Sequence, residues 1–161
     1  MKAIRVHELG GPEVLRYEDI PVPEPASGEA LVRIEAAGGN FLDIYYRSGF
    51  HWGGHHQRAL PYIPGAEGAG SVVAVGDGVA GISVGDRVAY GISNGDGSYA
   101  QFKSVPAWHL FKIPDTVGST IAGSVMQQGM TAQYLSHSVF PLDASHTALV
   151  HAAAGGTGLL L

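Results

Sequence analysis

The spacing of glycine in this chain sets the strongest limit on its fold. The 161 residues include 24 glycines, and most of them separate short apolar runs such as Leu31–Ile34, Ser71–Val75 and Arg87–Tyr90. Short runs between turn residues predict β-strands, since glycine weakens helices and supplies turn conformations. The glycines do not recur with the period of three found in collagen. We therefore expect a mainly β body with tight turns.

Charge and hydropathy argue against two classes of partner. The formal net charge is −5 and the nine Lys and Arg residues form no basic cluster, which argues against a nucleic-acid surface. No run reaches the roughly 18 to 20 apolar residues that span a membrane, and the N-terminal MKAIRVHELGGPEVL lacks the apolar region of a secretory signal. These features predict a cytoplasmic protein. The sequence has no Cys, so it offers no disulfide and no thiolate ligand for a metal.

The N-terminal two-thirds of the chain is predicted to consist mostly of strands. The expected strands begin with Lys2–His7, Leu15–Ile20 and Glu29–Ala37 and continue, after a surface loop over His51–Pro64, as far as Phe111. The turn Gly10-Gly11-Pro12 separates the first two.

A short helix is predicted after Asn40. Asn is a favourable N-cap residue, and Phe41, Ile44 and Tyr45 recur at the i, i+3, i+4 spacing of one helix face. Asn40 would then lie at the start of the helix, with the aromatic side chains on one side.

The pattern changes near residue 115. Two stretches with helical spacing, Thr120–Gln128 and Thr131–Val139, are followed by Thr147–Val150, which we interpret as a buried strand. This strand would lead into the glycine loop of HAAAGGTGLLL, residues 151–161.

The glycine loop matches a dinucleotide-binding fingerprint. Ala153–Gly158 fits Gly-x-Gly-x-x-Gly with Ala at the first position, and a following helix would present its N-terminal amides to phosphate groups. A glycine-rich turn without a ligand fits the same spacing. The residue that reads the ribose is expected about 20 positions later, so we expect these residues to form a half-built site.

Several separated stretches, in order along the chain, resemble the zinc-independent quinone oxidoreductases, the ζ-crystallin-like branch of the medium-chain dehydrogenase/reductase superfamily. They are GGPEVL at 10–15, NFLDIYYRSG at 40–49, PGAEGAGSVVAVGDGV at 64–79, GDRVAY at 85–90, GSYAQF at 97–102, QGMTAQYL at 128–135 and HAAAGGTGLL at 151–160. The resemblance implies a GroES-like β-barrel catalytic domain over residues 1–120. It also implies that residues 121–161 hold the helices, first strand and glycine loop of a truncated Rossmann α/β domain.

The resemblance also indicates which metal chemistry to expect. The zinc-dependent alcohol dehydrogenases carry Cys where Asn40 stands and His where Ala66 stands, and neither an amide nor a methyl group is a zinc ligand. We therefore expect no metal. Glu67, beside Ala66, is interpreted as a hydrogen-bonded structural acid.

The chemistry implied is hydride transfer from NADPH to a quinone or another activated alkene, without zinc. The implied catalytic residues are Asn40 and Tyr45, with Tyr45 either a proton donor or a packing aromatic. The residues expected to bind the cofactor are Asn40, Phe41, Gln128, Thr131, Ala154, Gly155, Gly156 and Gly158. We expect the complete enzyme to carry the activity, the 161-residue chain to bind NADPH poorly, and a homodimer of the complete protein to be one arrangement.

Two alternatives remain open at this point. The acceptor could be an enoyl thioester or another activated alkene rather than a quinone, or the chain could be a non-catalytic GroES-like binding module. His51, His55 and His56 invite a metal site, but their loop holds no carboxylate to complete it, so a loop near the substrate cleft is the preferred interpretation.

Overall fold

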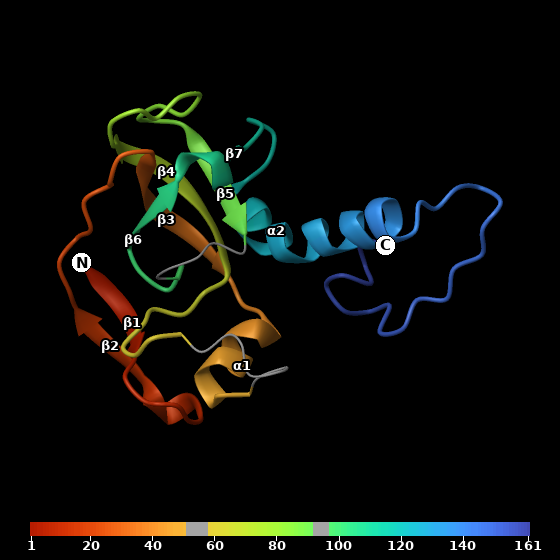
Figure 1. Cartoon of the computed structure of the whole chain (residues 1–161), viewed down its shortest axis with the longest axis horizontal. Helices are drawn as coiled ribbons and strands as arrows, with labels where there is room; N and C mark the ends of the chain where they lie inside the picture. The colour runs from red at the N-terminus through yellow and green to blue at the C-terminus, as the bar shows by residue number, and fades with distance from the viewer. Residues whose placement is uncertain (51–57, 92–96) are drawn as a thin grey trace.

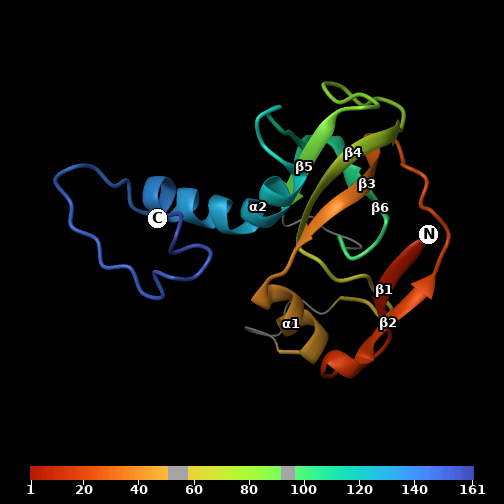
Figure 2. The ribbon, with the colours of Figure 1, turned by 180° about the vertical axis from the view of Figure 1, so that it is seen from behind.

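The computed structural model describes residues 1–50, 58–91 and 97–161. These residues form a β body of two sheets, from which a long helix leads away toward the C-terminus (Figure 1). The N-terminus lies on the side of the body away from this helix, as the opposite view also shows (Figure 2). The mainly β fold expected from the glycine spacing is confirmed.

The smaller sheet is an antiparallel pair at the N-terminus. β1 (Lys2–Val6) pairs with β2 (Leu15–Asp19), and the turn between them contains a 3₁₀ helix at Pro12–Val14. Val6 packs with the buried Val14 and Tyr62. The two predicted strands are thus present, each one residue shorter than expected.

The larger sheet has five antiparallel strands in the order β6-β3-β4-β5-β7. The strands are β3 (Glu29–Gly38), β4 (Glu67–Val75), β5 (Arg87–Gly91), β6 (Phe102–Pro106) and β7 (Phe111–Lys112). Close packing of β3 on β4 depends on glycine, because a methyl group at Gly70 would overlap the backbone carbonyl of Arg33.

The main core of the body is built from the apolar runs between the glycines. Val32, Val72 and Val88, one from each of the runs named above, are fully buried together. β-Branched side chains fit the pleated surface of a sheet, and their burial stabilises the body by removing apolar area from water. The runs are short because the chain reverses direction after each strand.

α1 (Phe41–Ser48) begins after Asn40 and ends at Gly49, whose φ of 75° is readily adopted by glycine. The predicted helix and its N-cap are therefore confirmed. The predicted apolar face is turned outward in the described chain, since Phe41 is 74% exposed and Ile44 is 43% exposed.

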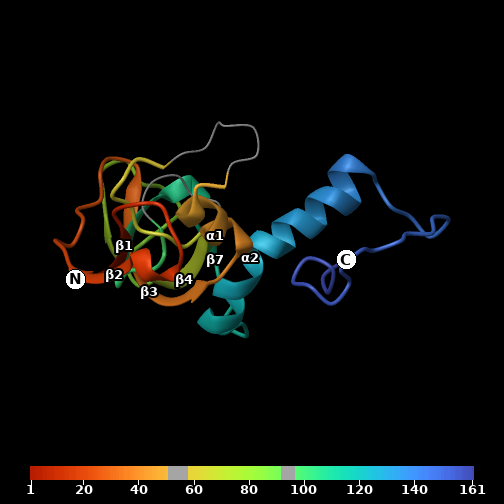
Figure 3. The ribbon, with the colours of Figure 1, turned by 90° about the horizontal axis from the view of Figure 1, so that it is seen from below.

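α2 (Ser119–Gln133) begins the helical region predicted after residue 115. The two predicted stretches form one α-helix that continues into a π-helical segment, Tyr134–Val139. Gly129 does not interrupt it, because a glycine inside a helix costs only about 1 kcal/mol relative to alanine. The start of α2 packs on the large sheet, where Ala122 joins the buried Ala69 and Ala89. Figure 3, from below, shows the rest of α2 extending beyond the β body.

The buried strand predicted over Thr147–Val150 is wrong. Residues 147–150 have no strand structure, and Leu149 is 85% exposed. A strand needs a neighbour that satisfies its backbone groups, and none of the strands in the described residues pairs with this segment. Residues 151–160 follow as a series of turns that return toward α2 (Figure 1).

The surface loop predicted over His51–Pro64 is wrong in its last residues. Tyr62 and Ile63 are buried, because Tyr62 bridges to Val6 of β1 and so connects this segment to the small sheet. Residues 51–57 of that loop, with His51, His55 and His56, lie outside the described residues. Within the described ranges, no helix has the length and apolar character needed to cross a membrane.

Candidate functional site

A cavity of about 630 Å³ lies between the residues at the start of α1, one face of α2 and the C-terminal turns. Its lining includes most of the predicted site residues, namely Asn40, Phe41, Gln128, Thr131, Gly155, Gly156 and Gly158. These residues come from three distant parts of the sequence, so their shared cavity is a property of the fold. Tyr45 and Ala154 do not belong to this lining.

Asn40 connects three elements around the cavity. Its backbone N–H donates to the Asp43 carboxylate at 3.0 Å, the reciprocal bond of a capping box. Its side-chain Nδ2 donates to Oε1 of Glu67 at 2.9 Å, and its Oδ1 accepts from Nε2 of Gln128 at 3.1 Å. Asn40 is therefore both the N-cap of α1 and a link between β4 and α2.

Glu67 is the hydrogen-bonded acid that the sequence indicated. Its side chain is fully buried at the first position of β4. Besides the bond from Asn40, its Oε2 accepts from the backbone N–H of Gln127 in α2 at 2.7 Å. Both carboxyl oxygens are thus hydrogen-bonded, as buried polar groups require.

Asp43 is a buried residue that is hydrogen-bonded to Asn40, and it was not among the predicted site residues. It accepts hydrogen bonds from the N–H groups of Asn40 and Gly65 and from the Tyr99 hydroxyl, at 3.0, 3.1 and 3.3 Å. Burial raises the pKa of Asp43, and these donors partly oppose the rise. Burial and the adjacent Asp43 carboxyl raise the pKa of Tyr99 to about 12. The Asn40-x-x-Asp43 spacing of a capping box was the available signal.

Gln128 and Thr131 form the α2 side of the cavity. The Thr131 hydroxyl donates to the Gln127 carbonyl at 2.8 Å, which leaves its oxygen as an acceptor. Gln128 Oε1 is buried, and no described residue donates a hydrogen bond to it. A carboxamide such as that of nicotinamide carries an N–H donor of the kind that this oxygen lacks.

The glycine loop forms the third side and does not have the expected strand-turn-helix form. The amides of Gly155 and Leu159 donate to nearby carbonyls within the turns, at 2.8 and 2.9 Å. Gly156 lies against Gln128, because a methyl group there would approach its Cγ to 2.7 Å. A phosphate site of the predicted kind places its amides at the start of a helix, and residues 151–160 form turns rather than a helix.

The aromatic residues of α1 lie together on its exposed side. The rings of Phe41 and Tyr45 stack with centroids 6.4 Å apart, and the ring of Tyr45 lies 5.2 Å from that of Phe50. Such pairs are typical of packing aromatics. A catalytic role for Tyr45 stays a prediction.

The family of the chain follows from sequence comparison. The family model described as the alcohol dehydrogenase GroES-like domain matches residues 26–115, which cover β3 to β7 and α1. The chain belongs to this family. Within the described part of the chain, no three His, Asp or Glu side chains are grouped so that they could hold a metal ion.

Relatives of this GroES-like chain share its sequence along almost its whole length. The quinone oxidoreductase of Pseudomonas aeruginosa is 43% identical over 158 residues, covering 98% of this chain and 47% of that protein. The structure of Escherichia coli quinone oxidoreductase complexed with NADPH has a TM-score of 0.91 and 36% identity over 99% of this chain and 47% of its own. Mycobacterial Rv1454c complexed with NADPH has a TM-score of 0.91 and 48% identity, covering 99% and 48% of the two chains.

The chain therefore spans about half the length of the relatives it matches. The part of that length present here supplies the β body and the three parts of the chain that line the cavity.

Proposed function

We propose that this chain is the N-terminal part of an NADPH-dependent quinone oxidoreductase that works without zinc. Residues 1–120 would form the catalytic domain and residues 121–161 the start of the cofactor domain. The observation that carries the proposal is the cavity that joins Asn40 and Phe41 to Gln128 and Thr131 of α2. The similarity to quinone oxidoreductases, two of whose related structures hold NADPH, supports it.

In this proposal the protein binds and orients the reactants. NADPH supplies a hydride for an electron-poor acceptor. Asn40 and Gln128 would hold the nicotinamide end by hydrogen bonds, and Phe41 would cover the acceptor and exclude water. Asn40 stands at the position of a zinc ligand in zinc-dependent relatives, and its amide is already bonded to Glu67 and Gln128. An amide is not a zinc ligand, so Asn40 supports the part of the proposal that excludes zinc.

The protein expressed from the complete reading frame that contains these residues tests the proposal. We expect it to oxidise NADPH when 1,4-benzoquinone is added, at a rate that added zinc or a chelator does not change. An enoyl thioester and a simple activated alkene serve as comparison acceptors, and a higher kcat/KM with either of them would replace the quinone assignment. Absence of NADPH oxidation with all three acceptors would contradict the proposal.

A binding module is the second candidate, and one observation favours it. Leu149 is 85% exposed and Leu159 is 74% exposed, and a partner that covered them would remove apolar area from water. The same assay separates the candidates, because a binding module gives no turnover with any acceptor. The cytoplasmic location and the homodimer stay predictions, which cell fractionation and sizing of the complete protein would test.

A further inference from the structure

Glu67 occupies a position that the sheet keeps open for it. In the β3–β4 register it lies opposite Gly38, and a methyl group at Gly38 would overlap its carboxyl group. Its side chain is completely buried, and it forms no ion pair within the described part of the chain. A buried carboxyl group without a counter-ion is costly unless donors surround it, so its hydrogen bonds are important for the fold.

The two oxygens of Glu67 accept from different elements. Oε1 accepts from the side chain of Asn40, and Oε2 accepts from the backbone N–H of Gln127. A carboxylate can only accept, whereas an amide side chain has a donor end and an acceptor end. Glu67 therefore requires the Nδ2 end of Asn40 to point toward β4.

The orientation of the Asn40 side chain in turn fixes the orientation of Gln128 in α2. With Nδ2 bound to Glu67, the Oδ1 end of Asn40 faces α2, where it accepts from Nε2 of Gln128 at 3.1 Å. The Nε2 end of Gln128 is therefore in use. Its other end, the acceptor Oε1, is buried, and no described residue donates a hydrogen bond to it. Each amide in the series is oriented by the one before it, and the first is oriented by the carboxylate.

We propose that Glu67 is a positioning residue that sets the hydrogen-bond polarity of the cavity. Through Asn40 it leaves Gln128 with its acceptor Oε1, rather than its donor Nε2, as the unpaired group beside the cavity. Resting on the proposed function, this polarity would select a ligand group that donates an N–H, which is the chemistry of the nicotinamide carboxamide.

The substitution Glu67→Gln tests the polarity because it keeps the size of the side chain. The backbone N–H of Gln127 would hold the new Oε1, so the new Nε2 would donate to Asn40. Asn40 and then Gln128 would each have to turn by half a rotation, and Gln128 would end with Nε2 as its unpaired group. The hydrogen bonds reverse rather than vanish, so we expect the folded protein to be retained.

Nuclear magnetic resonance of the protein from the complete reading frame, with ¹⁵N in its Asn and Gln side-chain amides, reads the orientation directly. In the parent protein the Asn40 Nδ2 protons should show contacts to β4 and the Gln128 Nε2 protons should exchange slowly. In Glu67→Gln the Asn40 contacts should move to α2 and the Gln128 protons should exchange faster. Unchanged contacts in the folded variant would overturn the inference.

Glu35→Gln is the matched control. Glu35 also receives two hydrogen bonds, from the hydroxyls of Ser71 and of Ser119 in α2, both at 2.6 Å, but it is exposed and does not line the cavity. Hydroxyls can rotate to suit either partner, so this variant should leave the Asn40 and Gln128 signals unchanged.

Steady-state kinetics of the same proteins then tests the link to NADPH. We expect Glu67→Gln to raise the KM for NADPH roughly tenfold while changing kcat less, because one buried mismatched hydrogen bond costs about that factor. If the Asn40 and Gln128 contacts reverse but the KM for NADPH does not change, the claim that this polarity selects an N–H donor on the ligand is wrong. If the parent protein does not use NADPH, the proposed function fails, while the contacts still decide whether Glu67 sets the polarity.

Discussion

Asp43 is a buried carboxyl group that holds three parts of the chain together. Its two oxygens accept from the start of α1, from Gly65 before β4 and from the hydroxyl of Tyr99. Burial of a carboxyl group is unfavourable, and the hydrogen-bond donors offset that cost. Asp43 therefore holds the backbone of Asn40 from within α1, whereas Glu67 holds the Asn40 side chain from β4.

Replacing Asp43 by Asn should destabilise the protein. One oxygen would become an NH₂ group that faces an N–H or O–H donor, so at least one buried donor would lose its partner. We expect the free energy of unfolding at pH 7 to fall by about 1–3 kcal/mol. Urea unfolding of the parent protein and of Asp43→Asn measures this free energy. Equal free energies of unfolding for the two proteins would show that the hydrogen bonds to Asp43 make no net contribution to stability.

The same pair of proteins should differ in pH dependence. The pKa of Asp43 is raised in the folded state, chiefly by burial, so its protonation favours folding. Its contribution to stability is complete below the unfolded pKa, about 3.9, and is lost as the pH rises through the raised folded pKa. The difference in unfolding free energy between parent and Asp43→Asn should therefore be larger in acid than at pH 7. A difference that does not vary with pH would contradict this.

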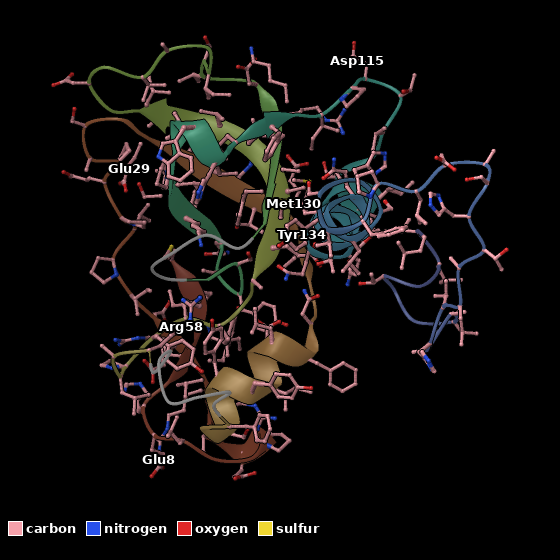
Figure 4. All side chains as sticks on the ribbon, turned by 45° about the vertical axis from the view of Figure 1, so that its right-hand side comes forward. Glu8, Glu29, Arg58, Asp115, Met130 and Tyr134 are labelled. Carbon is pink, nitrogen blue, oxygen red and sulfur yellow. The ribbon has the colours of Figure 1, made fainter. Side chains whose placement is uncertain are left out.

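At the scale of elements, α2 shows how one helix serves two environments. Its first half packs closely on the sheet, where a methyl group at Gly123 would approach the Ala36 carbonyl oxygen to 3.0 Å and the Ala69 nitrogen to 3.2 Å. Gly129, two turns later, has open space around it, with the nearest atom at 4.0 Å. Figure 4, which looks along the helix, places Met130 between α2 and the sheet, in agreement with its closeness to Gly91.

Two alanine substitutions should distinguish these environments. Gly129→Ala should stabilise the protein by up to about 1 kcal/mol, because alanine favours the helix. Gly123→Ala gains the same preference but must displace the sheet backbone, so it should be about 1–3 kcal/mol less stable than Gly129→Ala. Thermal and urea unfolding measure both. Equal effects would show that α2 can move away from the sheet at no cost.

At the scale of the whole molecule, the two ends of the proposed cofactor cavity differ. One end is lined by Asn40, Gln128 and Thr131, the residues proposed to meet the nicotinamide, whereas at the other end the amides of Gly155 and Leu159 donate within local turns. The sequence predicted both ends from the same resemblance. The second end lacks the predicted strand-turn-helix form within the described residues.

The 161-residue chain should therefore bind NADPH more weakly than the protein from the complete reading frame. We expect a difference of at least about tenfold, because each hydrogen bond to a charged phosphate group contributes about 1.5–3 kcal/mol. Titration followed by nicotinamide fluorescence measures both affinities, and NADH serves as a second ligand. Equal micromolar affinities would show that the turns rearrange into a complete phosphate site.

Local pattern was enough to predict much of the β body. The apolar runs between glycines became strands whose valines fill the core, and Asn40 capped a helix, because each depends on neighbours in sequence. The strand predicted over Thr147–Val150 failed for the opposite reason. Its apolar residues met the local requirement, but a strand also needs a pairing partner, which the described chain does not give it.

The sequence by itself thus determined the turn-rich β body and the residue types at the candidate site. The tertiary structure alone decided how those residues are joined. Asn40 meets Glu67 across 27 positions and Gln128 across 88, and no periodicity extends over such distances. The hydrogen-bond polarity of the cavity depends on which end of each amide faces which neighbour. That choice arises only when β4 and α2 have packed around Asn40, because a buried donor must then face an acceptor.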